Sequence, residues 1–318
     1  MTQISLVSDI GGTNTRVALS RDGEVDASTV RRYRNRNYSG LDQIYTSFME
    51  EFGVSCDGAC IALAGPVAEG AGRLTNLDWS YDSAQLAAAT GASTTALLND
   101  LQAQGHAVPF VSSESLVSIL PGPKAEERKS KLVIGVGTGF NSVPVFRTEF
   151  GHFVPPCETG HTSFPVLSEE DMSLARYVAA HHGFPGVEDV LSGRGIERIY
   201  AWASGEDVHK SSAEIVGLIA ADADETARKT AEAFCRALGR VAGDLALTHL
   251  PFGGVYLTGG MAAAMRPHLS RYGFDDAFRD KGRFSEFMDQ FAVWSVEDDY
   301  AALLGCARHI HGLIAAER

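Results

Sequence analysis

Near its start the chain places a carboxylate before a turn of two glycines and a threonine, Asp9 followed by Gly11-Gly12-Thr13. Because glycine has no Cβ, successive backbone N–H groups of such a turn can converge on one anionic oxygen. Thr13 adds a hydroxyl donor and Arg16 a cation, while Asp9 stands where a magnesium ion, held through its water shell, could bridge to the same phosphate. A Gly-Gly pair alone is typical of an ordinary hairpin, but these added side chains favour a phosphate site.

Two more glycine-rich turns follow apolar stretches, at residues 135–139 and 253–260, and each also carries a threonine. One such turn is weak support for a ligand site. Three together indicate one nucleotide gripped from two domains, since ligands usually bind where strands end. The chain contains no G-x-x-x-x-G-K-[ST] motif and no G-x-G-x-x-G motif after a strand. A P-loop is therefore excluded, and a dinucleotide-binding fold is unsupported.

The acid–base candidates are Asp100, the pair Glu158 and His161, and Glu188. Asp100 directly follows an apolar stretch, where a partly desolvated carboxylate could accept a proton from an alcohol. On residue type alone, a helix N-cap is an equally good interpretation of Asp100. The spacing of Glu158 and His161 also occurs in di-iron helical bundles, but these need a second copy of the motif, which the sequence lacks. The residue types suit a polyol better than a metal.

The elements that must position these groups alternate between strand and helix. Apolar residues crowd 4–7 and alternate through 17–19, which predicts two short strands joined by the first glycine turn. Further along, the predicted elements are a helix over 41–52, a strand over 60–64, a helix over 83–89 and a strand over 95–98. Such alternation indicates an α/β layer.

The segment 111–131 is rich in serine, proline, glycine and charge, so we interpret it as a domain boundary. A second α/β unit is expected to begin at 132–134. The remaining predicted elements are a long amphipathic helix from about 224 to 249, a strand over 255–257 and a closing amphipathic helix over 303–314. Because 318 residues exceed what one core usually holds, two domains are expected.

The charge balance opposes a nucleic-acid partner. The net charge is −13, whereas binding to phosphate backbones needs a clustered excess of Lys and Arg. The one basic run, at 31–36, is interpreted as a solvated edge or loop because no second basic patch accompanies it. Hydrophobic residues make up 45% of the chain and charged residues 21%, which indicates a globular protein with a large core.

Five cysteines are spread along the chain, with no secretory signal and no apolar run long enough to cross a membrane. Cys56 and Cys60 lack the second pair of ligands that a zinc site needs, so we interpret them as packing residues. We expect a cytoplasmic protein without a membrane partner, and a homodimer.

In their order along the chain, these motifs resemble those of the bacterial ATP-dependent glucokinases, and the resemblance covers nearly the whole chain. The stretches that carry it are Asp9-Ile10-Gly11-Gly12-Thr13-Asn14-Thr15-Arg16, Leu98-Asn99-Asp100, Gly137-Thr138-Gly139, Glu158-Thr159-Gly160-His161, 188–193, 252–260 and 278–284. The resemblance implies the actin-like, ribonuclease H-like ATPase fold, with two α/β domains facing a cleft. The smaller domain would comprise 1–110 plus 300–318, and the larger one 111–299.

The resemblance also implies an activity and roles for single residues. ATP, with Mg²⁺ held by Asp9 through water, would phosphorylate glucose to glucose 6-phosphate. The residues implied to hold glucose are Asn99, Asp100, Glu158, His161 and Glu188. Of these, Asp100 would be the base on the 6-hydroxyl. The residues implied to hold ATP are Asp9, Gly11, Gly12, Thr13, Asn14, Arg16, Gly137, Thr138, Gly139, Gly259, Gly260 and Met261.

Three positions depart from the family pattern: Asn141 and Thr159 replace glycines, and Arg194 replaces a proline. Asparagine tolerates a left-handed backbone, so the phosphate turn is expected to survive, while Thr159 could alter the anomeric side of the sugar pocket. Two alternatives stay open, a sugar-binding regulatory protein without turnover and a kinase for another hexose. The retained Asp9, Thr13 and Asp100 argue against the regulator.

Overall fold

The computed structural model describes residues 2–74, 77–123, 128–149, 151–206 and 208–317. The chain packs into two compact units. Unit 1 comprises Met1–Val111, Val145–Pro156 and Asp298–Arg318, and unit 2 comprises Ser112–Pro144 and Cys157–Glu297. Residues 124–127, inside the segment interpreted as a domain boundary, lie outside the described residues. The domain boundaries expected from the sequence stay a prediction. Within the described residues, no helix combines the length and hydropathy needed to cross a membrane.

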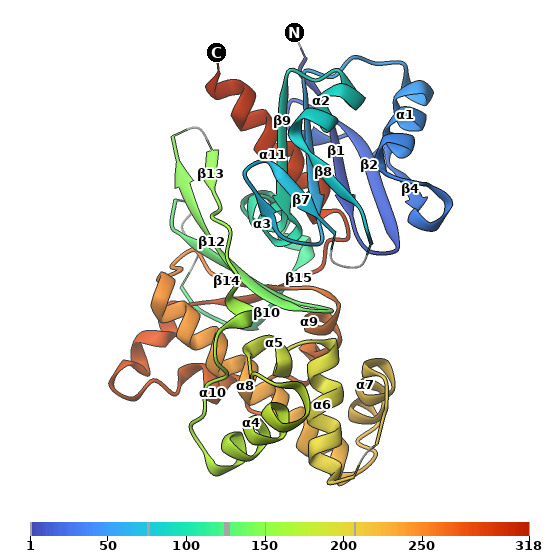
Figure 1. The fold of residues 1–318 in the computed structure, drawn as a ribbon. Helices are drawn as coiled ribbons and strands as arrows, with labels where there is room; N and C mark the ends of the chain where they lie inside the picture. The colour runs from blue at the N-terminus through green and yellow to red at the C-terminus, as the bar shows by residue number, and fades with distance from the viewer. Residues whose placement is uncertain (1, 75–76, 124–127, 150, 207, 318) are drawn as a thin grey trace. The chain divides into compact units, whose positions relative to one another are not determined.

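In the described part of unit 1, six strands form one sheet (Figure 1). They are β1 (Ile4–Ile10), β2 (Asn14–Arg21), β3 (Glu24–Val25), β4 (Arg31–Arg34), β5 (Gly58–Leu63) and β9 (Thr94–Asn99). The order is β3-β2-β1-β5-β9, and β4 pairs with β2. β1 and β2 form an antiparallel hairpin across the first glycine turn, whereas β1, β5 and β9 run parallel. Their carboxyl ends therefore meet at one edge of the sheet.

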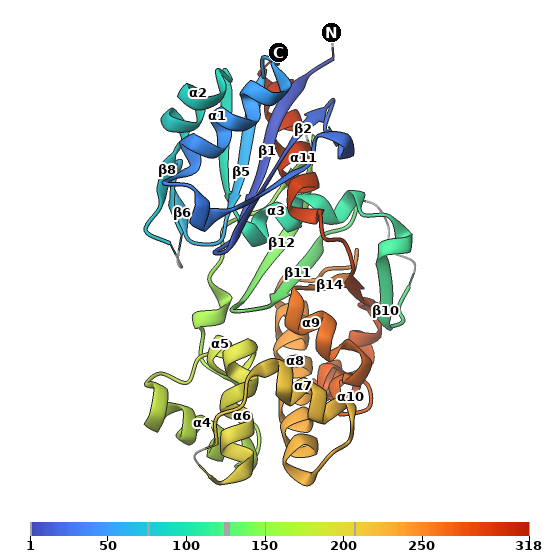
Figure 2. The same ribbon diagram turned by 90° about the vertical axis from the view of Figure 1, so that its right-hand side faces the viewer.

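Side chains of this sheet alternate between two hydrophobic clusters, one on each face. The helices α1 (Leu41–Phe52) and α2 (Ser83–Thr90) cover one face, and α3 (Asp100–Ala107) and α11 (Ala301–Ala316) cover the other (Figure 2). α3 and α11 pack backbone to backbone, since a Cβ on Gly305 would lie 1.7 Å from the carbonyl oxygen of Ala103. A small antiparallel sheet consists of β6 (Val67–Ala68), β7 (Ala71–Arg73) and β8 (Ser80–Asp82).

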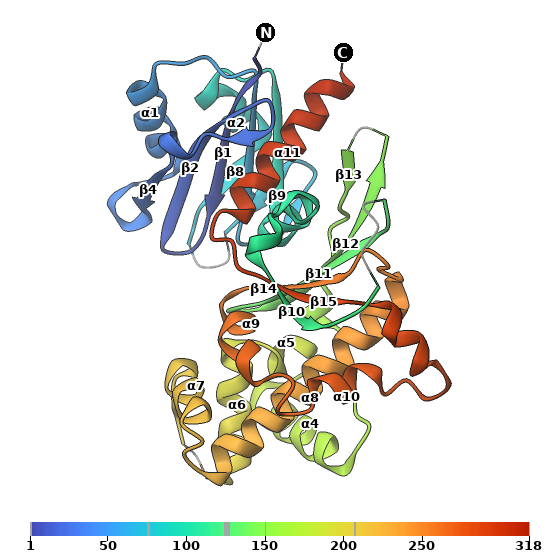
Figure 3. The ribbon, with the colours of Figure 1, turned by 180° about the vertical axis from the view of Figure 1, so that it is seen from behind.

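A second sheet has the order β10-β15-β14-β11-β12-β13 (Figure 3). Its strands are β10 (Leu116–Leu120), β11 (Lys131–Val136), β12 (Phe140–Thr148), β13 (Gly151–Phe153), β14 (Val255–Thr258) and β15 (Val293–Val296). β11, β14 and β15 run parallel, so the order β13-β12-β11-β14-β15 repeats that of the first sheet. The strand β12 continues from unit 2 into unit 1.

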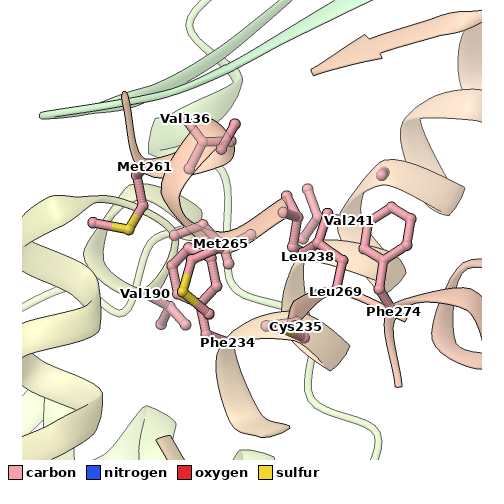
Figure 4. Close-up of a cluster of buried hydrophobic side chains, with 14 of the residues drawn as sticks. Val136, Val190, Phe234, Cys235, Leu238, Val241, Met261, Met265, Leu269 and Phe274 are labelled. Carbon is pink, nitrogen blue, oxygen red and sulfur yellow. The ribbon is translucent and has the colours of Figure 1, made fainter. Parts of the chain in front are cut away.

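The helices of unit 2 are α4 (Glu169–His182), α5 (Val187–Val190), α6 (Gly193–Ser204), α7 (Ser212–Ala220), α8 (Glu225–His249), α9 (Gly260–Met265) and α10 (Phe274–Arg279). The long helix α8 begins after Asp224, whose carboxylate accepts a hydrogen bond from the Ala227 N–H at 2.7 Å. Its apolar face lies in a buried cluster with α9, where Phe234 and Leu238 pack near Met265 (Figure 4).

The strands and helices predicted from periodicity are confirmed within a few residues at each end. The basic run 31–36 forms β4 and the start of a 3-10 segment, Asn35–Asn37. Its arginines are exposed or half-buried as expected, but Asn35 is buried. Cys56 and Cys60 lie in hydrophobic clusters, which confirms their packing role.

Candidate active site

The side chain of Asn35, which is 1% exposed, braces the first glycine turn through hydrogen bonds. The Asn35 amide donates to the carbonyl of Gly11 at 2.8 Å, and its side-chain oxygen accepts from the Thr15 hydroxyl at 2.8 Å. The backbone N–H of Asn35 donates to the Thr13 carbonyl at 3.0 Å. Because these bonds occupy two carbonyl groups of the turn, they hold its backbone in one conformation. Sequence reasoning missed Asn35.

Asp9 lies at the end of β1, and its carboxylate is 3.7 Å from the guanidinium of Arg16 on β2. Arg16 also donates to the carbonyl of Asp299 at 2.7 Å and lies over the Tyr300 ring. Burial raises the pKa of Asp9, and the Arg16 charge opposes that rise. The Asp9 side chain is still 25% exposed, which leaves a hard oxygen donor open to a ligand.

Asp100 is the first residue of α3, and Asn99 is the N-cap. The Asn99 side-chain oxygen accepts from the Leu101 N–H at 3.0 Å, and its amide donates to the Gly65 carbonyl at 3.0 Å. Gln102 completes a capping box by accepting from the Asn99 N–H at 3.1 Å. The N-cap interpretation of Asp100 is therefore wrong, because Asn99 has that role.

The parallel pairing within unit 1 brings the Asp9 turn and Asn99 to the same edge. Ile10 pairs with Leu63 on β5, and Leu63 pairs with Asn99 on β9. Two strand spacings separate β1 from β9, about 10 Å. The first glycine turn and the start of α3 thus lie within the reach of one ligand.

In unit 2 the Gly137-Thr138-Gly139 turn joins β11 to β12. The N–H of Gly137 donates to the Gly139 carbonyl at 2.9 Å, and the Gly193 N–H at the start of α6 donates to the Gly137 carbonyl at 2.8 Å. A Cβ on Gly139 would lie 2.6 Å from a carboxylate oxygen of Glu188. Glycine is needed at 139 because Glu188 approaches so closely.

Glu188 is tied to this turn, an arrangement that sequence reasoning did not foresee. One carboxylate oxygen accepts from the Phe140 N–H at 3.0 Å, and the other forms an ion pair with Arg194 at 3.2 Å. The Glu188 side chain remains 24% exposed. Arg194, which stands where the family pattern has proline, thus acts as the counter-ion of a predicted sugar ligand.

Glu158 and His161 are exposed at the two ends of a short turn and are joined by a hydrogen bond from the His161 N–H to the Glu158 carbonyl, 3.2 Å long. The following residues pair with the start of α5, since the Val187 N–H donates to the Thr162 carbonyl at 2.9 Å. Unit 2 therefore brings Glu158, His161 and Glu188 into one neighbourhood.

Asn141 is an extended residue of β12, and it is not among the described residues with a positive φ. The expectation that asparagine serves there by tolerating a left-handed backbone is therefore wrong. Its side chain instead makes hydrogen bonds to the Cys157–Thr159 segment.

The third glycine turn divides between the two ends of β14. Gly253 and Gly254 precede the strand, whereas Gly259 and Gly260 follow it, so the expectation of one turn over 253–260 is wrong. Gly259 has φ +98°, and a Cβ there would lie 2.6 Å from the Val136 carbonyl oxygen. Gly259 and Gly260 thus lie beside the end of β11, next to the Gly137 turn. The Met261 side chain is 8% exposed and belongs to the hydrophobic cluster (Figure 4).

Within the described residues, no three His, Cys, Asp or Glu side chains are grouped so that they could hold a metal ion. The predicted magnesium site asks for only one carboxylate together with phosphate oxygens and water, and Asp9 has the required donor and exposure.

The family model for glucokinase matches residues 6–312. The glucokinase of Chromohalobacter salexigens is 33% identical over 316 residues, 98% of each chain. The crystal structure of a glucokinase from an Antarctic psychrotroph has a TM-score of 0.87 at 30% identity, and the match covers 97% of this chain and 99% of that one. A glucokinase of the ROK family from Streptomyces griseus, solved with glucose and AMPPNP, has a TM-score of 0.63 at 16% identity, and the match covers 98% of this chain and 99% of that one. These matches confirm the expected actin-like α/β fold.

Proposed function

This chain belongs to the glucokinase family, and from that premise we propose that it is an ATP-dependent hexose kinase that converts glucose to glucose 6-phosphate. The observation that carries the proposal is the match of the family model to nearly the whole chain. The neighbourhood of the braced Asp9 turn and the carboxylate of Asp100 supports it. Neither a sugar-binding regulator nor a kinase for another hexose is favoured by this match.

Asp100 is the proposed base. Its position at the start of α3, next to the capping residue Asn99, fixes its backbone at the carboxyl edge of the first sheet, and its carboxylate accepts from the Leu101 N–H at 2.8 Å. There it would orient the 6-hydroxyl of glucose and accept its proton as the hydroxyl oxygen bonds to the γ-phosphorus of ATP. The bond from that phosphorus to the bridging oxygen breaks, and ADP leaves. Since phosphoryl transfer depends mostly on positioning and charge stabilisation, a rigidly held carboxylate suits this task.

The proposed nucleotide contacts come from backbone groups of the glycine turns. The Asp9 turn, with Thr13, Asn14 and Arg16, would hold the phosphates together with the Gly137 turn. Gly259 and Gly260 would contact the adenosine through their backbone, because the Met261 side chain is occupied by core packing. Asp9 would hold Mg²⁺ through water, and a bound Mg²⁺ neutralises charge on the phosphates.

The proposed sugar contacts are Asn99, Asp100, Glu158, His161 and Glu188. Glu158 and His161 are exposed and close in sequence, so they can meet neighbouring hydroxyl groups of one pyranose. Both oxygens of Glu188 already accept bonds from the protein. Its remaining lone pairs would accept from the sugar, while Arg194 stays its ion-pair partner.

Further proposals concern the partners, the oligomeric state and the location of the protein. The net charge of −13 disfavours nucleic acid, and we propose a homodimer in the cytoplasm that has no membrane partner. Light scattering coupled to gel filtration measures the oligomeric state directly, and a mass of a single chain of 34.0 kDa would contradict the dimer.

A coupled assay with ATP, Mg²⁺ and a panel of hexoses tests the proposed function. We expect turnover that requires both ATP and Mg²⁺ and that is fastest with glucose. Calorimetry on the sugar complex should show binding of Mg²⁺ with a non-hydrolysable ATP analogue. Sugar binding without any nucleotide binding or turnover would favour the regulator, and faster turnover of another hexose would reassign the substrate.

A further inference from the structure

One side chain, Asn141, holds the backbone on both sides of Glu158. Its amide nitrogen donates to the carbonyl of Cys157 at 2.5 Å, and its side-chain oxygen accepts from the N–H of Thr159 at 3.0 Å. The same oxygen accepts from the Ser142 N–H at 2.8 Å. Because Asn141 engages both a donor and an acceptor of the segment, it sets its conformation more tightly than a single bond would.

Thr159 adds a second link to the same strand. Its hydroxyl lies 3.0 Å from the Ser142 hydroxyl and 3.2 Å from the Asn141 side-chain oxygen. Ser142 is fully buried, so this link is anchored in the interior of unit 2. Asn141 and Thr159, the two residues that stand where the family pattern has glycine, are thus hydrogen-bonded to each other.

These bonds hold the backbone from which the Glu158 side chain projects. The Cys157 carbonyl belongs to the peptide that joins Cys157 to Glu158, and the Thr159 N–H belongs to the peptide that joins Glu158 to Thr159. When both peptide planes are held, the Cα–Cβ direction between them is also fixed. A glycine at 141 would leave the Cys157 carbonyl and the Thr159 N–H without these partners and would let the turn move.

We propose that Asn141 is a positioning residue that fixes Glu158 and thereby sets the discrimination among hexoses. The inference rests on the proposed function, because it takes Glu158 as a sugar ligand. A hydrogen-bonding group held in one place accepts a hydroxyl in one configuration and rejects its epimer, since a misplaced hydroxyl leaves buried polar groups unpaired. The same carboxylate on a loose turn would accept either epimer.

The test compares Asn141→Ala with Thr148→Ala, an exposed position on the same strand β12. For Asn141→Ala we expect the KM for glucose to rise about tenfold, and the preference in kcat/KM for glucose over galactose and mannose to fall by a similar factor. The KM for ATP should change by less than about twofold, the range of a surface substitution. Thr148→Ala should match the parent in all three quantities.

Thr159→Val removes the hydroxyl but keeps the N–H that donates to the Asn141 side-chain oxygen. It should lose less hexose selectivity than Asn141→Ala. The double variant should lose less selectivity than the sum of the two single losses, because the two residues share one hydrogen-bond network. A rise in the KM for ATP with unchanged hexose preference would assign Asn141 to the nucleotide turn and overturn the inference.

Hydrogen exchange separates this inference from the proposed function. Without any substrate, the amide of Thr159 should exchange faster in Asn141→Ala than in the parent or in Thr148→Ala. An active parent with faster exchange but unchanged selectivity in Asn141→Ala would overturn the inference alone. A parent inactive on every hexose would overturn the proposed function. Selectivity would then be measured as sugar binding by calorimetry, and Asn141→Ala should show the same loss of preference for glucose.

Discussion

The first residue of α3 carries the carboxylate on which the proposed reaction depends. Asp100→Asn keeps the shape of the side chain but removes its basicity, so we expect kcat to fall on the order of 10²-fold or more, while sugar binding is largely retained. Steady-state assays measure the first quantity and calorimetry the second. Asp82→Asn, at the N-cap of α2, is the matched control and should retain activity. Near-parental turnover by Asp100→Asn would leave Asp100 without a catalytic role.

Asn35 allows a controlled test of the first glycine turn, because a second asparagine, Asn37, is exposed in the same 3-10 segment. In Asn35→Asp, the donor to the Gly11 carbonyl becomes an acceptor that faces another acceptor. We expect a stability loss of roughly 1–3 kcal/mol and a clear rise in the KM for ATP, with the KM for glucose little changed. Asn37→Asp makes the same change of charge in solvent and should change neither. Equal behaviour of the two variants would show that Asn35 does not brace the turn.

The contact between α3 and α11 predicts a pH dependence of stability. The rings of His106 and His309 lie 4.3 Å apart. Burial lowers the pKa of His309 to about 4, and burial together with the nearby His309 and His152 lowers the pKa of His106. Between the unfolded pKa, about 6.5, and the lower folded value, the unfolded chain binds more protons than the folded one. Stability should therefore be complete above that range and fall as the pH drops through it.

For His309 alone, acidification from pH 7 to 5 should cost roughly 2 kcal/mol. Urea unfolding at the two pH values measures the loss, and His309→Gln should shrink it relative to the parent. His209→Gln, at an exposed histidine, serves as the control and should leave the pH dependence as in the parent. An identical dependence in the parent and His309→Gln would refute the assignment.

For the whole molecule, the proposed sugar ligands are divided between the units, with Asn99 and Asp100 in unit 1 and Glu158, His161 and Glu188 in unit 2. If one glucose contacts both sets, as proposed, its binding links the two units. Because glucose would bind the closed form more tightly than the open form, it would shift the population toward the closed form. Closure would also exclude water, which otherwise competes as an acceptor of the phosphoryl group.

We therefore expect a smaller radius of gyration by solution scattering with saturating glucose than without it. The compaction should be weaker in Glu158→Gln, which alters a ligand on unit 2. Thr148→Ala is the control and should compact like the parent. Unchanged scattering by a protein that demonstrably binds glucose would mean that the units do not close on the sugar.

Local patterns were enough to predict most of the elements and the turns that bear chemistry. The strands β1 and β9 and the helices α1 and α8 follow from periodicity, because side chains on one face of an element must be buried together. The glycines before and after these elements mark turns, because glycine adopts backbone conformations that other residues rarely adopt. The order of the motifs was enough to indicate the family, which the family model and the relatives then confirmed.

The bonds that hold the motifs in place could not be predicted in this way. Asn35 reaches Gly11 from 24 residues away, and Asn141 reaches Thr159 from 18 residues away. Such pairs depend on the register of strands and on how closely backbones approach, which no local spacing encodes. The same holds for Glu188, whose carboxylate meets the Phe140 N–H only because Gly139 leaves room for it. Residue types thus indicated the chemistry, whereas long-range packing determined which side chains hold its parts in place.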